Sequence, residues 1–222
     1  MSNLLARIKR LFRLRFAVFY PLAVYLAFFT VPSIRSTACG AVFMVAGMFM
    51  RLWSNGYAIK MDKLTTSGPY AYVRNPLYVG TGLILLGVVV MLKLFWVGLI
   101  TFAVLAAVYT RTIRSEQKML TDKFGAAFLD YCAKVPAMWS AFTPYEAGDK
   151  WPFSWQRVWD SREHKVVLWL TIVVIGFQLK REFMIEGERS HVRIIVMVAI
   201  ACCLALADVL GEVYRHRQKK GA

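Results

Sequence analysis

Cysteine is scarce in this sequence, and its spacing excludes the chemistry that often accompanies it. The 222 residues include four cysteines, and no two of them have the spacing of a metal-binding or redox motif. Three lie in apolar runs, where a thiol behaves as a small hydrophobic side chain. We therefore expect no metal site, and we assign no chemistry to Cys39, Cys132, Cys202 and Cys203.

Acidic residues are also few, since 13 aspartates and glutamates stand against 28 lysines and arginines, for a net charge of +15. The basic residues gather at the ends of apolar runs rather than on one continuous face, and no nucleic-acid motif accompanies them. Anionic lipid headgroups are therefore a more natural expected partner than nucleic acid. No small-residue cleavage site follows the first apolar run, so a cleavable signal peptide is not expected.

Apolar residues are abundant: 58% of the chain is hydrophobic and the mean hydropathy is positive, as is typical of an integral membrane protein. Six apolar runs lie near the lower edge of the roughly 17–25 residues that a spanning helix needs. The fifth is short enough to be re-entrant or buried among the others. We expect an all-α, polytopic membrane bundle with helices at 16–31, 38–53, 77–92, 94–109, 166–179 and 194–207.

Lys93 alone separates the third and fourth runs. A straight helix through both would be about 50 Å long, against a hydrocarbon core of about 30 Å. The chain is therefore expected to turn within residues 91–95 and to form a tight helical hairpin.

Basic residues flank the first and last runs, and such residues favour the cytoplasmic side of a membrane. With an even number of spans, both termini are expected in the cytoplasm. The same rule places the polar segments 54–76 and 110–165 on that side, so the two segments should face the cytoplasm together.

These features divide the chain into three parts. Residues 1–63 hold a basic segment and two membrane helices, 64–145 hold a polar loop, the hairpin and a cytoplasmic helix end, and 146–222 hold the remaining two spans. In the last part, three tryptophans recur at helical spacing and predict a short amphipathic helix in the inner headgroup layer. They are Trp151, Trp155 and Trp159.

The segment GPYAYVRNPLYVG, residues 68–80, gathers polar and rigid residues where the third run begins. Pro76 suits the first position of a helix, and Asn75 suits the cap before it. The preceding residues should form an extended or turn segment with Tyr70, Tyr72 and Arg74 on one side. Unpaired N–H groups at the helix start, with the Arg74 charge, would suit an anion, and tyrosine rings would suit a flat or cationic group. The same residues also suit a plain interfacial anchor.

A second polar segment, residues 109–145, continues directly from the fourth run. Tyr109, Thr112, Glu116 and Leu120 recur at helical spacing on one face, so Glu116 should be carried inward from the membrane boundary on a rigid helix. A solvated glutamate in a mixed-charge helix is the alternative. Basic residues occupy another face: Arg111, Arg114 and Lys118.

Together these stretches resemble the membrane methyltransferases typified by isoprenylcysteine carboxyl methyltransferase, to which phospholipid N-methyltransferases are related. The resembling pieces are LTTSGPYAYVRNPLYVG (64–80), RSEQKML (114–120) and FGAAFLDYCAKVP (124–136), with the hairpin between them. The resemblance implies an all-helical membrane fold. It also implies a site for S-adenosylmethionine at the cytoplasmic face, enclosed by the loop before the hairpin and the helix end after it.

The resemblance further implies which residues form the site. Catalytic or acceptor-binding positions fall on Arg111, Arg114 and Glu116, and cofactor contacts fall on Tyr70, Tyr72, Arg74, Asn75, Pro76, Tyr78 and Tyr131. Two positions depart from the family pattern. Many members carry histidine where this chain has Asn75, which cannot transfer a proton near neutrality, and many carry a glutamate pair where Glu116 is followed by Gln117.

The expected function is methyl transfer from S-adenosylmethionine to a lipophilic acceptor, with a carboxylate of isoprenylcysteine type placed first. A carboxylate arrives deprotonated, so alignment and exclusion of water could suffice. A phospholipid amine or a small thiol would benefit from a base, and Glu116 could serve. Two other classes stay open. One is a membrane sterol-type reductase with a nicotinamide cofactor, which would need more basic phosphate contacts, and the other is a non-enzymatic membrane protein.

Overall fold

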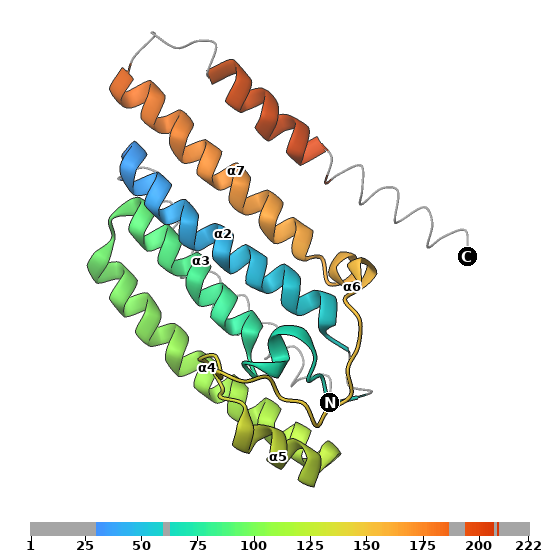
Figure 1. Ribbon diagram of the computed structural model, residues 1–222. Helices are drawn as coiled ribbons and strands as arrows, with labels where there is room; N and C mark the ends of the chain where they lie inside the picture. Colours follow the sequence, from blue (N-terminus) through green and yellow to red (C-terminus); the bar gives the residue numbers. More distant parts are fainter. Residues whose placement is uncertain (1–29, 60–62, 187–193, 207, 209–222) are drawn as a thin grey trace, which may run out of the picture.

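The computed structural model describes residues 30–59, 63–186, 194–206 and 208. Every element assigned in these residues is helical, which confirms the expected all-α class. The predicted run at 16–31 lies almost wholly outside the described residues. The long helices lie side by side in the order α7, α2, α3, α4 (Figure 1).

The long helices coincide with the apolar runs of the sequence. They are α2 (Ile34–Tyr57), α3 (Pro76–Leu92), α4 (Phe95–Phe124), α7 (Glu163–Arg181) and the Ile194–Leu206 helix. Shorter elements connect or extend them: η1 (Gly68–Ala71), α5 (Ala126–Lys134), α6 (Trp155–Asp160) and the π-helical turn η2 (Glu182–Glu186). α6 carries the exposed Trp155 and Trp159, whereas Trp151 precedes it, so the prediction of one helix through all three tryptophans is wrong for Trp151.

Within the part of the chain that the structure describes, two helices, α2 and α4, are long and apolar enough to cross a membrane. Many of their large apolar side chains point outward, and Val42, Phe49, Trp96 and Ile100 are each more than half exposed. Such a surface suits contact with lipid, whereas a core helix of a soluble protein would bury these side chains. α3 and the Ile194–Leu206 helix are apolar but shorter, so the expected total of six spans goes beyond what the described residues show.

The expected hairpin between α3 and α4 is confirmed. α3 ends at Leu92 and α4 begins at Phe95, while Lys93 adopts a left-handed backbone conformation with φ of 57°. The N–H of Leu94 donates to the Val89 carbonyl at 3.0 Å, which closes the turn. α4 therefore returns along α3 (Figure 1).

Glycines bring the backbones of α2 and α3 into direct contact. Gly40 and Gly47 of α2 lie one heptad apart, and so do Gly80 and Gly87 of α3. A Cβ atom at Gly47 would lie 2.5 Å from the Gly80 carbonyl oxygen, and one at Gly87 would lie 2.5 Å from the Gly40 carbonyl oxygen. Small residues at such positions are how apolar helices approach closely in lipid. Ser36, whose hydroxyl donates to the Met91 carbonyl at 2.9 Å, fixes one end of the pair.

Substituting Gly87 by alanine should destabilise the fold. The added methyl group would collide with the α2 backbone, and overpacking of this kind costs about 1–3 kcal/mol. Gly87→Ala should therefore lower the thermal unfolding midpoint in detergent. Gly82→Ala is the matched control, because it lies in the same helix and a Cβ there would meet nothing within 4 Å. Equal midpoints for the two variants would show that the α2–α3 contact is looser than described.

Candidate active site

A cavity of about 290 Å³ lies where α2 ends, α3 begins and α4 extends past the hairpin. Its volume is close to the lower end of the roughly 300–1,000 Å³ of small-molecule sites. The walls come from the segment after α2, from η1 and the residues that follow it, and from α3, α4 and α5. The lining residues are Ala58, Ile59, Lys63, Leu64, Thr65, Tyr70, Arg74, Asn75, Leu77, Tyr78, Ile113, Glu116, Gln117, Leu120, Phe124, Phe128 and Tyr131.

α4 carries Glu116 to this cavity. The helix has 30 residues and is about 45 Å long at 1.5 Å per residue, so it extends beyond a hydrocarbon core of about 30 Å. Glu116 is half-buried, and its Oε1 accepts a hydrogen bond from the Tyr78 hydroxyl at 2.9 Å. The Tyr78 ring packs against Tyr109, with 4.3 Å between centroids. The structure thus favours the predicted inward face of Glu116 over a fully solvated position.

Arg74 brings a positive charge to the same cavity. Its Nη1 donates to the Cys132 sulfur at 2.7 Å. Its Nε is buried and has no hydrogen-bond partner among the described residues. A buried polar group without a partner costs about 1–3 kcal/mol, and more when it is charged. Arg74 thus contributes a positive charge to the cavity lining.

Two tyrosines, the half-buried Tyr70 and the buried Tyr131, complete the polar wall. The Tyr131 hydroxyl, carried by α5, donates to the Tyr70 carbonyl at 2.6 Å. Burial raises the pKa of both phenols well above the ordinary value, and the negative charge of Glu116 raises the pKa of Tyr70 further. Both phenols are therefore neutral at physiological pH.

The segment that contains Arg74 is held by backbone hydrogen bonds to residues 136–145. Arg74 N–H donates to the Pro136 carbonyl at 2.9 Å, and Asn75 N–H donates to the Ala137 carbonyl at 3.2 Å. In the other direction, residues 141 and 145 donate to the carbonyls of residues 72 and 71. This pairing fixes the course of the cavity wall.

The start of α3 confirms one part of the sequence prediction and corrects two others. Asn75 occupies the cap position and Pro76 begins the helix, as expected. The Asn75 side chain, however, makes no capping bond and donates to the Ala137 carbonyl at 2.9 Å. Two of the N–H groups expected to be unpaired, those of Tyr78 and Val79, instead donate to the Asn75 carbonyl.

Tyr72 does not share a side with Tyr70 and Arg74, so that prediction is wrong. It lines a second cavity with Met50 and Trp53, whereas the other two line the first. The reason is local: Tyr72 has helical backbone angles (φ −111°, ψ −33°), which break the two-residue alternation of an extended segment. Whether Tyr72 contacts a cofactor stays a prediction.

Three more predicted site residues lie outside the cavity lining. Pro76 is buried in the first turn of α3, and Arg111 and Arg114 are exposed on α4. The two arginines could meet only a group at the protein surface, such as a lipid headgroup. Their catalytic role stays a prediction.

Sequence reasoning missed much of the apolar wall. Ile113 precedes Glu116 and Phe124 follows Leu120 at helical spacing, and Phe128 precedes Tyr131 by one turn, so periodicity could have found them. Lys63 gave no such signal. It lies in the segment after α2, with its Nζ 4.7 Å from the Trp151 ring centroid.

The fold and the cavity together define a helical protein whose apolar helices suit a membrane and whose cavity holds an arginine, a glutamate and several tyrosines. Residues 35–127 match the family described as "Phospholipid methyltransferase". This part of the chain is thus similar to that family, in agreement with the resemblance found in the sequence.

Three curated relatives extend the comparison. The chain is 32% identical to "Cobalt-zinc-cadmium resistance protein CzcN" of Cupriavidus metallidurans over 58% of its length and 61% of the relative. It is 30% identical to "Nickel-cobalt-cadmium resistance protein NccN" of Alcaligenes xylosoxydans xylosoxydans over 59% of its length and 62% of that relative. It is 38% identical to "Protein-S-isoprenylcysteine O-methyltransferase" of Schizosaccharomyces pombe over 33% of its length and 31% of that relative.

The chain thus spans about three fifths of the length of the first two relatives. No solved structure gives a significant match to it.

Proposed function

We propose that this chain is an integral membrane methyltransferase that uses S-adenosylmethionine and acts on a lipophilic acceptor, most simply a carboxylate of isoprenylcysteine type. The observation that carries the proposal is that Arg74, Glu116 and several tyrosines line one cavity. The family domain over residues 35–127 supports it.

The residues present fit the cofactor. Arg74 would hold its carboxylate by a charge-assisted hydrogen bond. Glu116 and the tyrosine rings would face its cationic part, and apolar residues such as Leu77 and Leu120 would contact its adenine. When bound, the cofactor supplies a methyl group already activated by a sulfonium. The chain then needs to bind and orient the cofactor and the acceptor and to exclude water. The paired segments 71–75 and 136–145 form the cavity wall that would do so.

The acceptor determines what Glu116 does. A carboxylate acceptor arrives deprotonated, so Glu116 would act only through its charge and its hydrogen bond with Tyr78. A phospholipid amine or a thiol would need to lose a proton, and Glu116 could accept it. One relative is named for isoprenylcysteine and the family for phospholipid, so both acceptors belong in the assay. In either case Arg111 and Arg114 would meet the acceptor's polar end at the surface.

The names of two relatives concern metal resistance. Among the described residues, no group of three or more histidine, cysteine, aspartate or glutamate side chains could hold a metal ion. That part of the chain therefore supplies no reason to assign direct metal binding to it.

The proposal includes a topology. We place six spans in the membrane, with both termini and the cavity on the cytoplasmic side, where anionic headgroups would meet the basic flanks. The exposed apolar surfaces of α2 and α4 support a membrane location, and the charges of the sequence support the orientation.

Arg74→Ala should weaken binding of S-adenosylhomocysteine, which keeps the carboxylate and lacks only the methyl group. Loss of a charge-assisted contact costs about 1.5–3 kcal/mol, or roughly tenfold to a hundredfold in affinity. Isothermal titration calorimetry of the purified protein in detergent measures the change.

Lys118→Ala is the matched control, because it removes one positive charge from an exposed position on α4 outside the cavity lining. It should bind as tightly as the wild type. Unchanged affinity in Arg74→Ala would show that Arg74 does not bind the carboxylate of S-adenosylhomocysteine. Binding of a reduced nicotinamide dinucleotide instead of S-adenosylhomocysteine would favour the reductase class, and binding of neither would favour a non-enzymatic protein.

Glu116→Gln should reduce methyl transfer while leaving the thermal midpoint close to wild type. Glutamine keeps the length of the side chain and can still accept the Tyr78 hydrogen bond, but it removes the charge and the basicity. Transfer of labelled methyl is measured with S-farnesylcysteine in one arm and phosphatidylethanolamine vesicles in the other. Activity equal to wild type on both acceptors would reject a role for the Glu116 charge.

Asp149→Cys should be labelled only from the cytoplasmic side of intact cells or oriented vesicles. The position is exposed, and the contacts recorded for Asp149 use its backbone carbonyl, so the substitution should be tolerated. The experiment uses a background in which the four native cysteines are replaced by serine. Labelling by an impermeant reagent from outside would overturn the orientation.

A further inference from the structure

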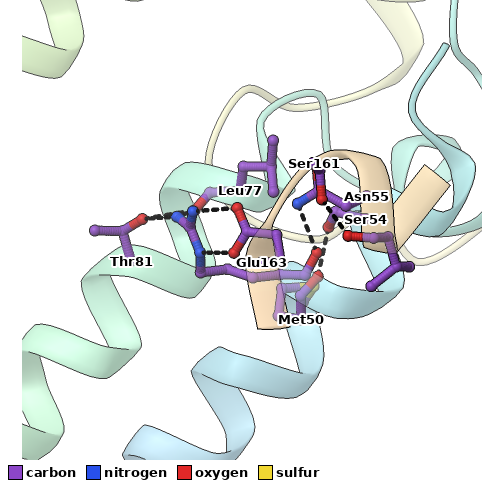
Figure 2. Close-up of polar contacts among 9 residues, drawn as sticks. Met50, Ser54, Asn55, Leu77, Thr81, Ser161 and Glu163 are labelled. Carbon is purple, nitrogen blue, oxygen red and sulfur yellow. Dashed lines mark hydrogen bonds and ion pairs between the residues drawn. The ribbon is translucent and has the colours of Figure 1, made fainter. Parts of the chain in front are cut away.

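A buried ion pair joins α2 to α7 close to the start of α3. The Arg51 Nε donates to Glu163 Oε2 at 2.8 Å, and its Nη2 donates to Oε1 at 2.6 Å. Only 20% of the Arg51 side chain and 10% of the Glu163 side chain are exposed. Figure 2 shows these contacts around Glu163.

The remaining nitrogen of Arg51 reaches α3. Its Nη1 donates to the Thr81 hydroxyl at 2.5 Å and approaches the Leu77 carbonyl at 3.4 Å. The Thr81 hydroxyl in turn donates to the Leu77 carbonyl at 2.9 Å. Arg51 therefore contacts the first two turns of α3.

This turn forms part of the cavity wall. Leu77 lines the cavity, and the next residue, Tyr78, donates to Glu116. A continuous set of contacts thus runs from Glu163 through Arg51 and the turn of α3 to the glutamate on α4. The negative charge of Glu163 and the positive charge of Arg51 also act on the pKa of Tyr70, which lines the same cavity.

Both members of the pair are themselves fixed. A Cβ at Gly80 would lie 2.7 Å from the Arg51 Cγ, so the arginine stem packs directly against the α3 backbone. Glu163 lies in the first turn of α7, where the helix dipole favours a negative charge. It follows Arg162, whose left-handed backbone (φ 62°) sets the start of α7.

We propose that Arg51 and Glu163 are positioning residues for the cavity, an inference that rests on the proposed function. Glu163 orients the guanidinium of Arg51, which then fixes the first turn of α3 and so aligns Tyr78 with Glu116. Glu163 lies outside residues 35–127, so the C-terminal part of the chain supplies a residue on which the site of the family domain depends. The alternative is a simple clamp, in which the ion pair links α2 to α7 and has no effect on the cavity.

Thr81→Val tests the contact on α3 while leaving the ion pair intact. Hydrogen–deuterium exchange of the ligand-free protein should be faster in peptides covering residues 74–82. The affinity for S-adenosylhomocysteine should fall about threefold to tenfold, the effect of one lost hydrogen bond. Thr101→Val is the matched control, because the Thr101 hydroxyl donates to a carbonyl of its own helix at 2.7 Å. Exchange and affinity in Thr81→Val that equal those of the control would overturn the proposal.

A charge swap separates positioning from clamping. The double variant Arg51→Glu, Glu163→Arg can restore an ion pair between α2 and α7, but a carboxylate at position 51 cannot donate to Leu77 or Thr81. Relative to Arg51→Glu alone, the double variant should regain thermal stability. Its hydrogen–deuterium exchange at residues 74–82 should stay fast, and its affinity for S-adenosylhomocysteine should stay low. Recovery of all three properties would show a clamp only and would overturn the proposal.

Hydrogen–deuterium exchange and ligand affinity test this inference and the proposed function separately. A wild-type protein that binds no S-adenosylhomocysteine would overturn the proposed function. The exchange experiment needs no ligand, so it still decides whether Arg51 and Glu163 hold the start of α3.

Discussion

The backbones of α2 and α3 touch because glycines face each other across the helix contact, and the position of the cavity follows from that contact. With no side chains between the two backbones, the last turns of α2 lie beside the first turn of α3. Arg51 can then reach the Leu77 carbonyl across the contact. The short turn at Lys93 returns α4 along α3, so Glu116 arrives opposite Tyr78.

Local signals in the sequence predicted much of this arrangement. A proline after an asparagine placed the start of α3, a lone lysine between two apolar runs placed the hairpin, and helical periodicity placed Glu116 on an inward face. The rest depended on contacts between distant segments. The N–H groups of Arg74 and Asn75 are occupied because residues 136–145 pair with this segment. Arg51 and Glu163 are 112 positions apart, and nothing in either local sequence relates them.

The cavity combines charges of both signs with neutral aromatic groups. Burial favours the protonated form of Tyr70 and Tyr131, so the charged side chains among the lining residues are those of Lys63, Arg74 and Glu116. Arg74 has an unused buried donor, and Glu116 has an acceptor already oriented by Tyr78. Such a pair suits a zwitterionic ligand with separated charges, which is how the site and the family domain support the same proposal.

The pairing of residues 71–75 with residues 136–145 has a consequence for biosynthesis. The segment with Arg74 is synthesised before α3 and α4, and the carbonyls that accept from Arg74 and Asn75 follow only after α5. A nascent chain that ends with α4 already contains most of the recognisable motif, but it has no Tyr131 and no partner for this backbone. The wall of the cavity is therefore complete only when residues 136–145 have folded back against the start of α3.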